Sequence, residues 1–294
     1  MTLPLVSVIT PAYNRCGFIE ETVQSVLGQD YPNIEYFVVD DGSDDGTFEI
    51  LQQLDMEGKI TLLWHEGHAN KGQSASINLG LSRVSGDYIA ILDSDDKFAS
   101  DKLSRQVAFL EKNTNVGMVY SNGMAIDQNN REIYQLLPDD HKENSDPNLL
   151  LLDCYIALPG ASLARRSVYE NVGYFEESFR SAQDHDMALR IMETHQVAYL
   201  PFIGFYYRRH NDSISVTGQE IRWRTGFPIL KRAAARYAYN PKTLRQRNAV
   251  LNFRLGQAFW RQSHYINAIP CFLKAAALDP YRALRVISRK ESVN

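Results

Sequence analysis

Short apolar runs alternate with helical segments through the first part of the chain, and this order limits the possible folds more than any other feature. The runs are rich in β-branched residues, as in LVSVIT at 5–10, while Ile19, Val23 and Val26 share one face of a helical segment. Near-continuous apolar strands between helices are typical of a parallel sheet covered on both faces. We therefore predict an α/β fold with a mostly parallel sheet flanked by helices. The expected strands are 5–10, 34–39, 60–64, 88–92 and 116–122, and the expected helices are 18–27, 47–54, 73–82 and 100–113.

Two of these strands run directly into clusters of carboxylates. The segment YFVVDDGSDDGT at 36–47 and the segment IAILDSDD at 89–96 both change from apolar to acidic within a few residues. Neighbouring like charges resist burial unless helix N-termini, basic side chains or a bound cation offset them. Ligands of parallel sheets bind beyond the carboxyl ends of the strands. Both clusters are therefore expected at a ligand site.

The second cluster has the spacing of a cation site. Asp93 and Asp95, two positions apart at a strand end, can both point to one hard divalent cation, Mn²⁺ or Mg²⁺. Helix capping is the alternative, because Asp is common before helices. An EF-hand is excluded, since no Gly or distal Glu stands at the required positions.

The first cluster has two readings. Asp40 or Asp41 could accept hydrogen bonds from a base or a ribose, as acidic groups do at other nucleotide sites. A plain turn is the alternative, because DDGSDDG is rich in residues that turn and cap.

Two later stretches add candidates for chemistry. Asp184, in SAQDHD, could be a general base at a helix start, and the same pattern also matches a capping box. In YYRRH at 206–210, His210 is a possible metal ligand, and the two arginines suit a diphosphate, although a basic loop end is the alternative. The remaining histidines considered, His65, His68 and His185, are expected at the surface.

Composition points to a reducing compartment. The 294 residues suffice for one large domain with an appendage, and no apolar run approaches the length of a membrane-spanning helix. The first residues lack the basic region and cleavage site of a secretory signal. The cysteines are Cys16, Cys154 and Cys271; they are odd in number, far apart and without zinc-ligand spacing, so no disulfide framework is expected. We expect a cytoplasmic protein.

Charge divides the chain near residue 220. Residues 221–294 contain 15 Lys or Arg and 2 acidic residues, a net charge of +13, while residues 1–220 carry −17. We predict domains at 1–217 and 218–294. The basic part could dock on the acidic body, or it could face anionic lipid at the inner side of a membrane, a protein partner or a phosphate-bearing acceptor. No nucleic-acid partner is expected.

The C-terminal segment has a helical pattern of its own. Within about 250–284, RLGQAFWRQSHYINAIPCFLKAAALDP resembles one tetratricopeptide unit, two antiparallel helices with small residues where they cross. One unit cannot bury its own face, so it must pack on a helix from 221–250, on the rest of the chain or on a partner. The polar stretch 127–148 is expected to be a mobile loop.

Taken in order, the motifs resemble glycosyltransferase family 2, the inverting nucleotide-sugar-dependent enzymes with a GT-A fold. The stretches that carry the resemblance lie within residues 5–217 and are VSVITPAYNR, VVDDGSDDGT, NKGQSASINLGLSRVSGDYIAILDSDD, PGASLARRSVYENVGYFEE, QDHDMALR and YRRHNDSIS. The resemblance implies a hexosyltransferase-type enzyme that moves a sugar from a nucleoside diphosphate to a hydroxyl of a carbohydrate or lipid-linked acceptor. Polysaccharide or glycoconjugate biosynthesis would be its setting.

The resemblance also assigns roles by position. It implies that Asp184 is the catalytic base and that Asp95 is the principal ligand of Mn²⁺ or Mg²⁺, with His210 completing the metal or diphosphate site. Asp93 would approach the donor's ribose or the metal. The residues implied to contact the nucleotide are Pro11, Tyr13 and Asp41, with Asp40 beside them.

Two positions depart from the family pattern. Many members have Glu before the base, where this chain has Gln183. Many carry Arg where Ile77 stands, so that donor contact is missing or is supplied by Lys71.

Two other functions compete with sugar transfer. A nucleotidyltransferase also uses strand-end carboxylates and a metal, but it usually needs a Gly-rich basic loop near the N-terminus, and VITPAYNR is not one. A degenerate glycosyltransferase could serve as a non-catalytic scaffold through its helical tail. The presence of Asp41, Asp95 and Asp184 argues against that function.

Overall fold

The computed structural model describes residues 3–210 and 218–287, and the chain divides into two compact units. The first unit holds the described residues up to 145 together with 155–178 and 183–210. The second holds 146–154, 179–182 and the described residues from 218 onward. The predicted boundary after residue 217 stays a prediction, because residues 211–217 lie outside the described part.

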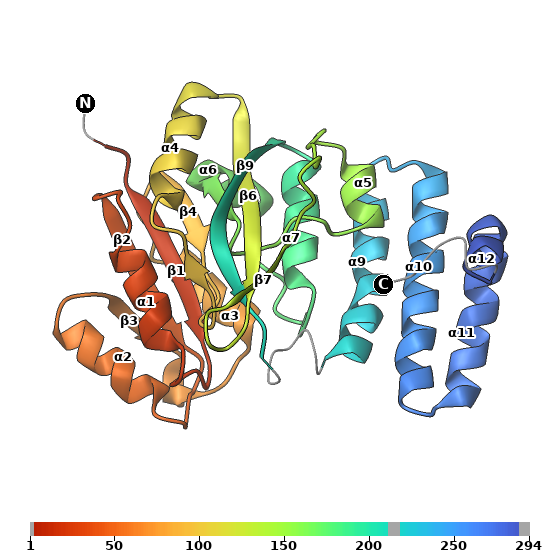
Figure 1. Ribbon diagram of the computed structural model, residues 1–294, viewed down its shortest axis with the longest axis horizontal. Coiled ribbons are helices and arrows are strands. Elements are labelled where there is room, and N and C mark those ends of the chain that lie inside the picture. The colour runs from red at the N-terminus through yellow and green to blue at the C-terminus, as the bar shows by residue number, and fades with distance from the viewer. Residues whose placement is uncertain (1–2, 211–217, 288–294) are drawn as a thin grey trace. The chain divides into compact units, whose positions relative to one another are not determined.

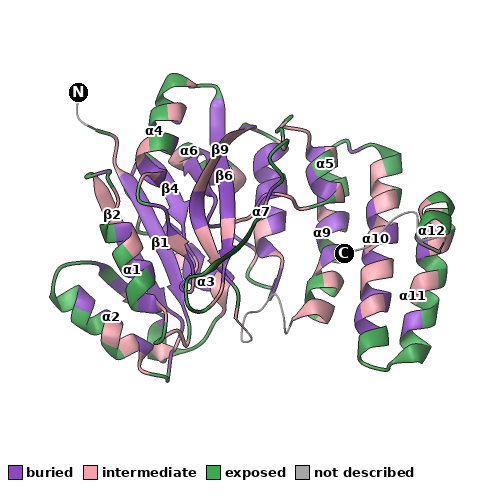
Figure 2. Ribbon diagram, in the orientation of Figure 1, coloured by how far each residue is buried: buried purple, intermediate pink, exposed green. Residues whose placement is uncertain are grey.

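The first unit is built on one sheet whose N-terminal half is parallel (Figure 1). Its strands run in the order β3-β2-β1-β4, and the expected strands in this region are confirmed to within two residues. Most residues of β1, β2 and β4 are buried (Figure 2), as their apolar sequences require. The bounds are β1 Val6–Ala12, β2 Ile34–Asp40, β3 Thr61–Trp64 and β4 Tyr88–Ile91.

The other half of the sheet contains antiparallel strands that the sequence pattern did not predict. β8 (Ser162–Arg165) runs antiparallel to β4 on one side and to β6 (Val116–Ile126) on the other. β9 (Gln196–Arg208) is parallel to β6 and antiparallel to the short β5 (Lys97–Phe98). The α/β fold class is therefore confirmed, with a mixed sheet.

The loop expected at 127–148 is partly wrong. β7 (Glu132–Gln135) pairs antiparallel with β6 inside this stretch, next to a register shift at Ala125 and Ile126. All four residues of β7 are exposed, so the strand gains backbone hydrogen bonds but buries no side chain. Polar, exposed edge strands give a weak sequence signal.

The helices of the first unit follow the expected amphipathic pattern. Ile19, Val23 and Val26 of α1 are all buried. α3 approaches β1 so closely that a Cβ on Gly80 would lie 2.6 Å from Cγ2 of Ile9, which explains the glycine there. The helices are α1 Ile19–Leu27, α2 Thr47–Met56, the 3₁₀ turn η1 Glu66–His68, α3 Gln73–Leu81, α4 Lys102–Lys112, α6 Arg166–Val172 and α7 Gln183–Met192.

The strand ends bring the acidic segments to one edge of the sheet. β1 and β2 are parallel and in register at their carboxyl ends, where Ala12 pairs with Asp40. β4 lies on the other side of β1 and leads into Asp93. The segments after these three strands therefore share the edge at which a parallel sheet binds ligands.

The second unit is helical. It contains α5 Pro147–Leu152, α9 Gln219–Arg236, α10 Pro241–Arg261, α11 Tyr265–Leu278 and α12 Pro280–Ile287. α10 and α11 form the expected antiparallel pair (Figure 1), with Gly256 at the crossing, where a Cβ would lie 2.8 Å from Cε1 of Phe272. Trp223 and Phe227 of α9 pack on the core of this pair, so a helix from 221–250 does cover it. Among the described residues, no helix combines the length and the apolar character needed to cross a bilayer.

One buried cation in the first unit gives a prediction that is independent of function. The fully buried Lys102 on α4 donates to Oε1 of Gln106 at 2.8 Å and to the carbonyl oxygen of Ser162 at 3.0 Å, and its Nζ lies 4.2 Å from the ring centre of Phe98. Burial lowers the pKa of Lys102 to about 7. In the unfolded chain the pKa is about 10.4. Between these values the unfolded state holds one proton more, so this lysine makes stability rise with pH.

We predict that Lys102→Met changes the pH dependence of stability. The unfolding free energy of the variant, relative to the wild type, should be highest below pH 7 and should fall by about 2–4 kcal/mol toward pH 10. Urea unfolding at several pH values measures this difference. The cost of losing the hydrogen bonds of Lys102 is the same at every pH, so it does not affect the change of the difference with pH. Lys112→Met, on the exposed side of the same helix, is the control. A difference that does not change with pH would contradict the titration.

Candidate functional site

The turn after β4 gathers three carboxylates whose partners come from distant parts of the first unit. Oδ1 of Asp93 accepts a hydrogen bond from Nε2 of Gln73 at 2.6 Å. Oδ2 of Asp95 lies 3.0 Å from Nε of Arg15 and 3.0 Å from Nε2 of His210. Asp93 and Asp95 therefore bind other side chains and not the backbone N–H groups at the start of a helix. The capping interpretation of Asp93 and Asp95 therefore has no support among the described hydrogen bonds.

The buried Arg208 forms hydrogen bonds with the same turn. Oδ1 of Asp96 accepts the backbone N–H of Arg208, and Nε of Arg208 donates to the carbonyl oxygen of Asp95 at 2.9 Å. Its NH2 group pairs with Glu21 at 2.7 Å, and the side chain is 1% exposed. The sequence suggested Arg208 for a diphosphate. Its contacts instead show that it stabilises the acidic turn, because Arg208 ends β9 and its side chain is buried against this turn.

Acidic side chains outnumber basic ones in this cluster. Burial, together with the charges of Asp95 and Asp184, raises the pKa of Asp93 to about 8. Burial also raises the pKa of Asp96 well above its usual range, with Asp95 and Asp93 adding to the effect. Burial acts in the same direction on Asp95, but the hydrogen bond with His210 and the charge of Arg15 bring its pKa below the usual value. We call Asp93, Asp95, Asp96 and Asp184 the acidic site.

Asp184 stands at the start of α7, within electrostatic reach of Asp93. It is half-buried, and its Oδ1 accepts the backbone N–H of His185 at 2.9 Å. The helix is anchored one turn further on, where the buried Asp186 pairs with Nε of Arg190 at 3.0 Å. His185 is itself buried, so the expectation of a surface histidine is wrong there; the short helix packs on most of its sides.

A chain of two amides connects the start of α7 to the acidic site. Nε2 of Gln183 donates to Oε1 of Gln73 at 2.6 Å, and Gln73 in turn donates to Asp93. Gln183 is 9% exposed, and its own Oε1 is buried without a hydrogen-bond partner. A buried carbonyl oxygen without a partner is costly. The position before Asp184 therefore presents an acceptor that a ligand hydroxyl would satisfy.

The acidic loop after β2 is held by backbone amides. Oδ2 of the buried Asp40 accepts the N–H groups of Gly42 and Ser43, both at 3.0 Å, so the turn interpretation is correct for Asp40. The two oxygens of Asp41 accept the N–H groups of Lys71 at 2.7 Å and Gly72 at 2.8 Å. Asp41 thus holds the loop that leads into α3.

Two histidines surround this loop. Nε2 of His68 lies 2.8 Å from Oδ2 of Asp40. His65 is buried, with its Nε2 3.0 Å from Oγ of Ser76 and 3.5 Å from Oδ1 of Asp41. The expectation that His65 lies at the surface is wrong, because the carboxylate and the hydroxyl give a buried imidazole two polar neighbours.

At the end of β1, Pro11 is buried and Tyr13 is exposed. Pro11 pairs with Val39 of β2 in the sheet. An exposed ring directly after a buried strand is free to contact a planar ligand. These two residues lie at the same edge of the sheet as the two acidic clusters.

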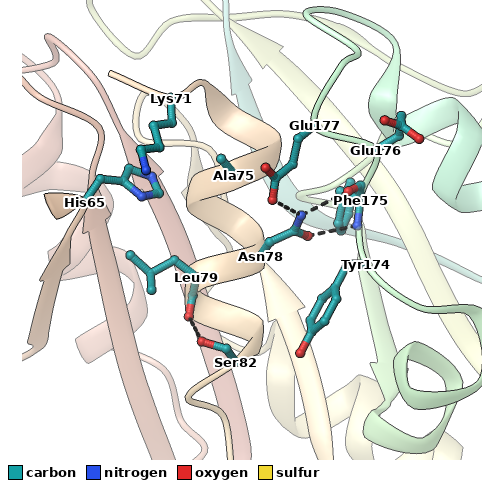
Figure 3. Close-up of a pocket in the computed structure, with 10 residues that line it drawn as sticks. All are labelled: His65, Lys71, Ala75, Asn78, Leu79, Ser82, Tyr174, Phe175, Glu176 and Glu177. Atoms are coloured by element: carbon teal, nitrogen blue, oxygen red, sulfur yellow. Dashed lines mark hydrogen bonds between the residues drawn. The ribbon is translucent and has the colours of Figure 1, made fainter. Parts of the chain in front are cut away.

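A cavity of about 660 Å³ lies beside α3 (Figure 3). Lys71 and His65 line one side, and Tyr174 and Glu176 line the other. Between them Asn78 donates to Oε1 of Glu177 and to the carbonyl oxygen of Phe175, and its Oδ1 accepts the N–H of Phe175. The remaining lining residues are Ala75, Leu79 and Ser82.

The sequence model of Glycosyl transferase family 2 matches residues 7–173, more than half of the chain. The chain belongs to glycosyltransferase family 2. Bacillus subtilis (strain 168) has a putative teichuronic acid biosynthesis glycosyltransferase, TuaG, that is 48% identical over 108 residues, 36% of this chain and 42% of TuaG. An uncharacterized glycosyltransferase of Rickettsia typhi is 32% identical over 200 residues, 67% of this chain and 61% of the relative. These matches span less than two thirds of either relative.

Solved structures share the fold of this family 2 chain. S. aureus TarS 1–349 in complex with UDP-GlcNAc has a TM-score of 0.69 at 20% identity, over 92% of this chain and 81% of that chain. The mannosyltransferase PcManGT from Pyrobaculum calidifontis, in complex with GDP-Man and Mn²⁺, has a TM-score of 0.63 at 21% identity, over 98% and 80%. The GT-A fold predicted from the sequence is thereby confirmed.

The acidic site of this family 2 chain contains side chains of the types that bind a divalent cation. Asp95 offers a carboxylate and His210 an imidazole nitrogen, and the pKa of Asp93 is raised by burial and by the neighbouring charges of Asp95 and Asp184. Within residues 3–210 and 218–287, no group of three or more His, Cys, Asp or Glu side chains is arranged to bind a metal. Among the described residues, Asp95 and His210 are the side chains that would hold such a cation.

The structure brings most of the predicted residues into two groups. Asp93, Asp95, Asp184 and His210 lie around the acidic site: His210 contacts Asp95, and the charges of Asp95 and Asp184 act on Asp93. Asp40, Asp41 and Lys71 form the second group, at the start of α3. Sequence reasoning missed Arg15, Gln73 and the inner role of Arg208. Arg15 had a visible signal, a cation directly after a strand end, whereas a glutamine such as Gln73 carries none.

Arg15 gives a prediction about the charge balance. We predict that Arg15→Gln lowers the unfolding free energy by about 1–3 kcal/mol in metal-free buffer, because Asp95 loses its guanidinium partner. Adding Mn²⁺ should restore part of the loss, since the cation replaces the missing charge. Urea unfolding with and without Mn²⁺ measures both effects. Arg83→Gln, at an exposed position, is the control and should change neither. An Arg15→Gln variant as stable as the wild type would contradict this balance.

Proposed function

We propose that the protein is an inverting glycosyltransferase that moves a sugar from a nucleoside diphosphate to an acceptor hydroxyl. One observation carries the proposal: in a chain of glycosyltransferase family 2, Asp184 at the start of α7 lies near enough to Asp93, after β4, for its charge to raise the pKa of Asp93. A carboxylate at a helix start and a carboxylate at a strand end would then serve the same bound sugar. S. aureus TarS 1–349 was solved in complex with UDP-GlcNAc and PcManGT in complex with GDP-Man, which supports a nucleotide-sugar donor here.

The donor's nucleotide would lie at the edge formed by the ends of β1 and β2. The exposed ring of Tyr13 would contact the base, and Pro11 and Asp41 with the neighbouring Asp40 would form the floor of the site. Lys71, which lines the cavity beside α3, would direct its ammonium group toward the diphosphate. This lysine would replace the arginine that many family members have where this chain has Ile77.

A divalent cation would be held by Asp95 and His210. When bound, Mn²⁺ or Mg²⁺ would act as a Lewis acid that stabilises the negative charge on the departing diphosphate. Asp93 would contact the ribose or the cation from the same turn. Arg15, which pairs with Asp95, would move its guanidinium toward the phosphates as the ion binds.

Asp184 would take the proton of the attacking hydroxyl. Its ordinary pKa, about 4, is far below that of an alcohol, so the proton moves late, after the new bond to the anomeric carbon has begun to form. Attack opposite to the leaving group inverts the configuration in one displacement. The unpartnered Oε1 of Gln183 would accept a hydroxyl of the sugar beside the base.

The setting we propose is polysaccharide or glycoconjugate biosynthesis in the cytoplasm. TuaG is named for teichuronic acid biosynthesis, and EpsE, a putative glycosyltransferase of the same Bacillus strain, is 28% identical over 300 residues, 99% of this chain and 97% of EpsE. The acceptor would be a carbohydrate or a lipid-linked saccharide. A lipid-linked acceptor would bring the protein to the inner face of the membrane.

The base assignment predicts a separation of binding from turnover. Asp184→Asn should lower kcat by at least about a thousandfold, because an amide cannot accept the proton, while the affinity for the nucleotide sugar stays within about threefold. Donor consumption across a panel of nucleotide sugars, with calorimetric titration of the donor, measures both. Asp140→Asn, at an exposed aspartate, is the matched control. Undiminished turnover in Asp184→Asn would remove the assignment.

Nucleotide binding separates the enzyme from a non-catalytic scaffold. We expect UDP, GDP or dTDP to raise the melting temperature by a few degrees in the presence of Mn²⁺ and by much less in EDTA, because bound ligand stabilises the folded state. Asp95→Asn should lose the metal-dependent part of the shift. A scaffold that had lost its donor site would show no metal-dependent shift with any nucleotide.

A further inference from the structure

The outer helix of the second unit exposes an apolar stripe. Ile266, Ile269 and Leu273 of α11 are 87%, 52% and 67% exposed, and their spacing puts them on one helical face. Ala268 and Ala275 are buried on the opposite face. α11 is therefore apolar on both sides, and only one side is packed. Figure 2 shows the helix largely exposed.

Aromatic and aliphatic side chains extend this surface at both ends of α11. On α12, Tyr281 and Leu284 are 72% and 66% exposed and lie one turn apart. Before α11, the exposed ring of Trp260 at the end of α10 contacts the exposed ring of Tyr265, the first residue of α11, with centres 4.7 Å apart. An apolar surface of this extent marks an interaction site. Its members are Trp260, Tyr265, Ile266, Ile269, Leu273, Tyr281 and Leu284, and we call them the α11–α12 surface.

Cationic side chains border the surface at α12. A cavity of about 470 Å³ between α10 and α12 is lined by Lys242, Arg245, Arg282 and Arg285, with Tyr281 shared between cavity and surface. Its acidic member, Asp279, accepts the backbone N–H of Arg282 and so belongs to the start of α12. The border therefore carries a strong positive charge, within a segment whose net charge is +13.

This charge decides between the possible occupants. A second copy of the chain, docked through the same surface, would bring two sets of these cations together at a cost. An apolar face with aromatic ends and Lys or Arg at its border is the pattern of helices that lie in a membrane interface. The complementary partner is an anionic lipid surface.

We propose that the α11–α12 surface docks the protein on an anionic phospholipid bilayer. Leu273, Ile266 and Ile269 would enter the boundary between headgroups and acyl chains, to a depth of about 5–10 Å. Arg282 and Arg285 would lie among the phosphates, and the aromatic rings at the headgroup level. The docking does not depend on sugar transfer, so it can be tested whether or not the proposed function holds.

Flotation of the full chain with vesicles tests the proposal. We expect binding to vesicles of phosphatidylcholine with about one third phosphatidylglycerol, a loss of binding in high salt, and at least about tenfold weaker binding to phosphatidylcholine alone. Ile266→Ser combined with Leu273→Ser should weaken binding to the anionic vesicles by about tenfold or more. Arg282→Gln combined with Arg285→Gln should weaken binding and flatten its salt dependence. Met56→Ser, which removes an exposed apolar side chain of the first unit, is the matched control.

A second measurement needs no variant and covers the case in which the serine variants unfold. Hydrogen exchange of the wild type should show protection in residues 260–285 when anionic vesicles are added and none with phosphatidylcholine alone. Equal binding to both vesicle types, or unchanged binding of both double variants, would overturn the proposal. Light scattering that shows a dimer abolished by Ile266→Ser would assign the surface to a second copy instead, as would protection that rises with protein concentration and without lipid.

Discussion

The first unit is organised around negative charge that has been moved out of water. Asp93 and Asp96 are held where burial raises the pKa of each, and Asp95 stays ionised only because Arg15 and His210 compensate it. Burying charge without a partner is among the costliest things a fold can do. The N-terminal loop, the end of β9 and the start of α3 each contribute a partner, so segments far apart in the sequence are tied to one turn.

At the neighbouring loop after β2, backbone amides stabilise the buried carboxylates. Asp41 accepts two N–H groups from the segment before α3, and Asp40 accepts two from its own turn. These carboxylates fix a loop that glycines allow to bend, because Gly42 has a φ of 82° and a Cβ there would lie 2.7 Å from the carbonyl oxygen of His68. The aspartates of the two clusters therefore have different structural roles. Asp40 and Asp41 fix the conformation of the backbone, whereas Asp93 and Asp95 bind side chains around the acidic site.

Local patterns predicted the parallel half of the sheet and α1, because continuous apolar strands and an amphipathic helix are visible within short stretches of sequence. The α10–α11 pair was predicted from its resemblance to a tetratricopeptide unit. They did not predict β7 or the antiparallel β8, whose pairing depends on strands distant in the sequence. In the site, strand-end carboxylates were visible as charges that follow apolar runs. Gln73 was not visible, since its role arises from contacts with Asp93 and Gln183 that only the fold creates. His65 was misjudged for the same reason, because its burial depends on Ser76 one helix further along.

Asn78 connects α3 to the segment that precedes α7. Its side-chain amide forms hydrogen bonds with Phe175 and Glu177 of that segment. The helix that begins near Lys71 is thereby fastened to the polypeptide that delivers Asp184. The position of Asp184 relative to the start of α3 is therefore fixed by these hydrogen bonds as well as by charge. In the function we propose, the loss of this one side chain would disturb the alignment of donor and acceptor without removing any group that takes part in the chemistry.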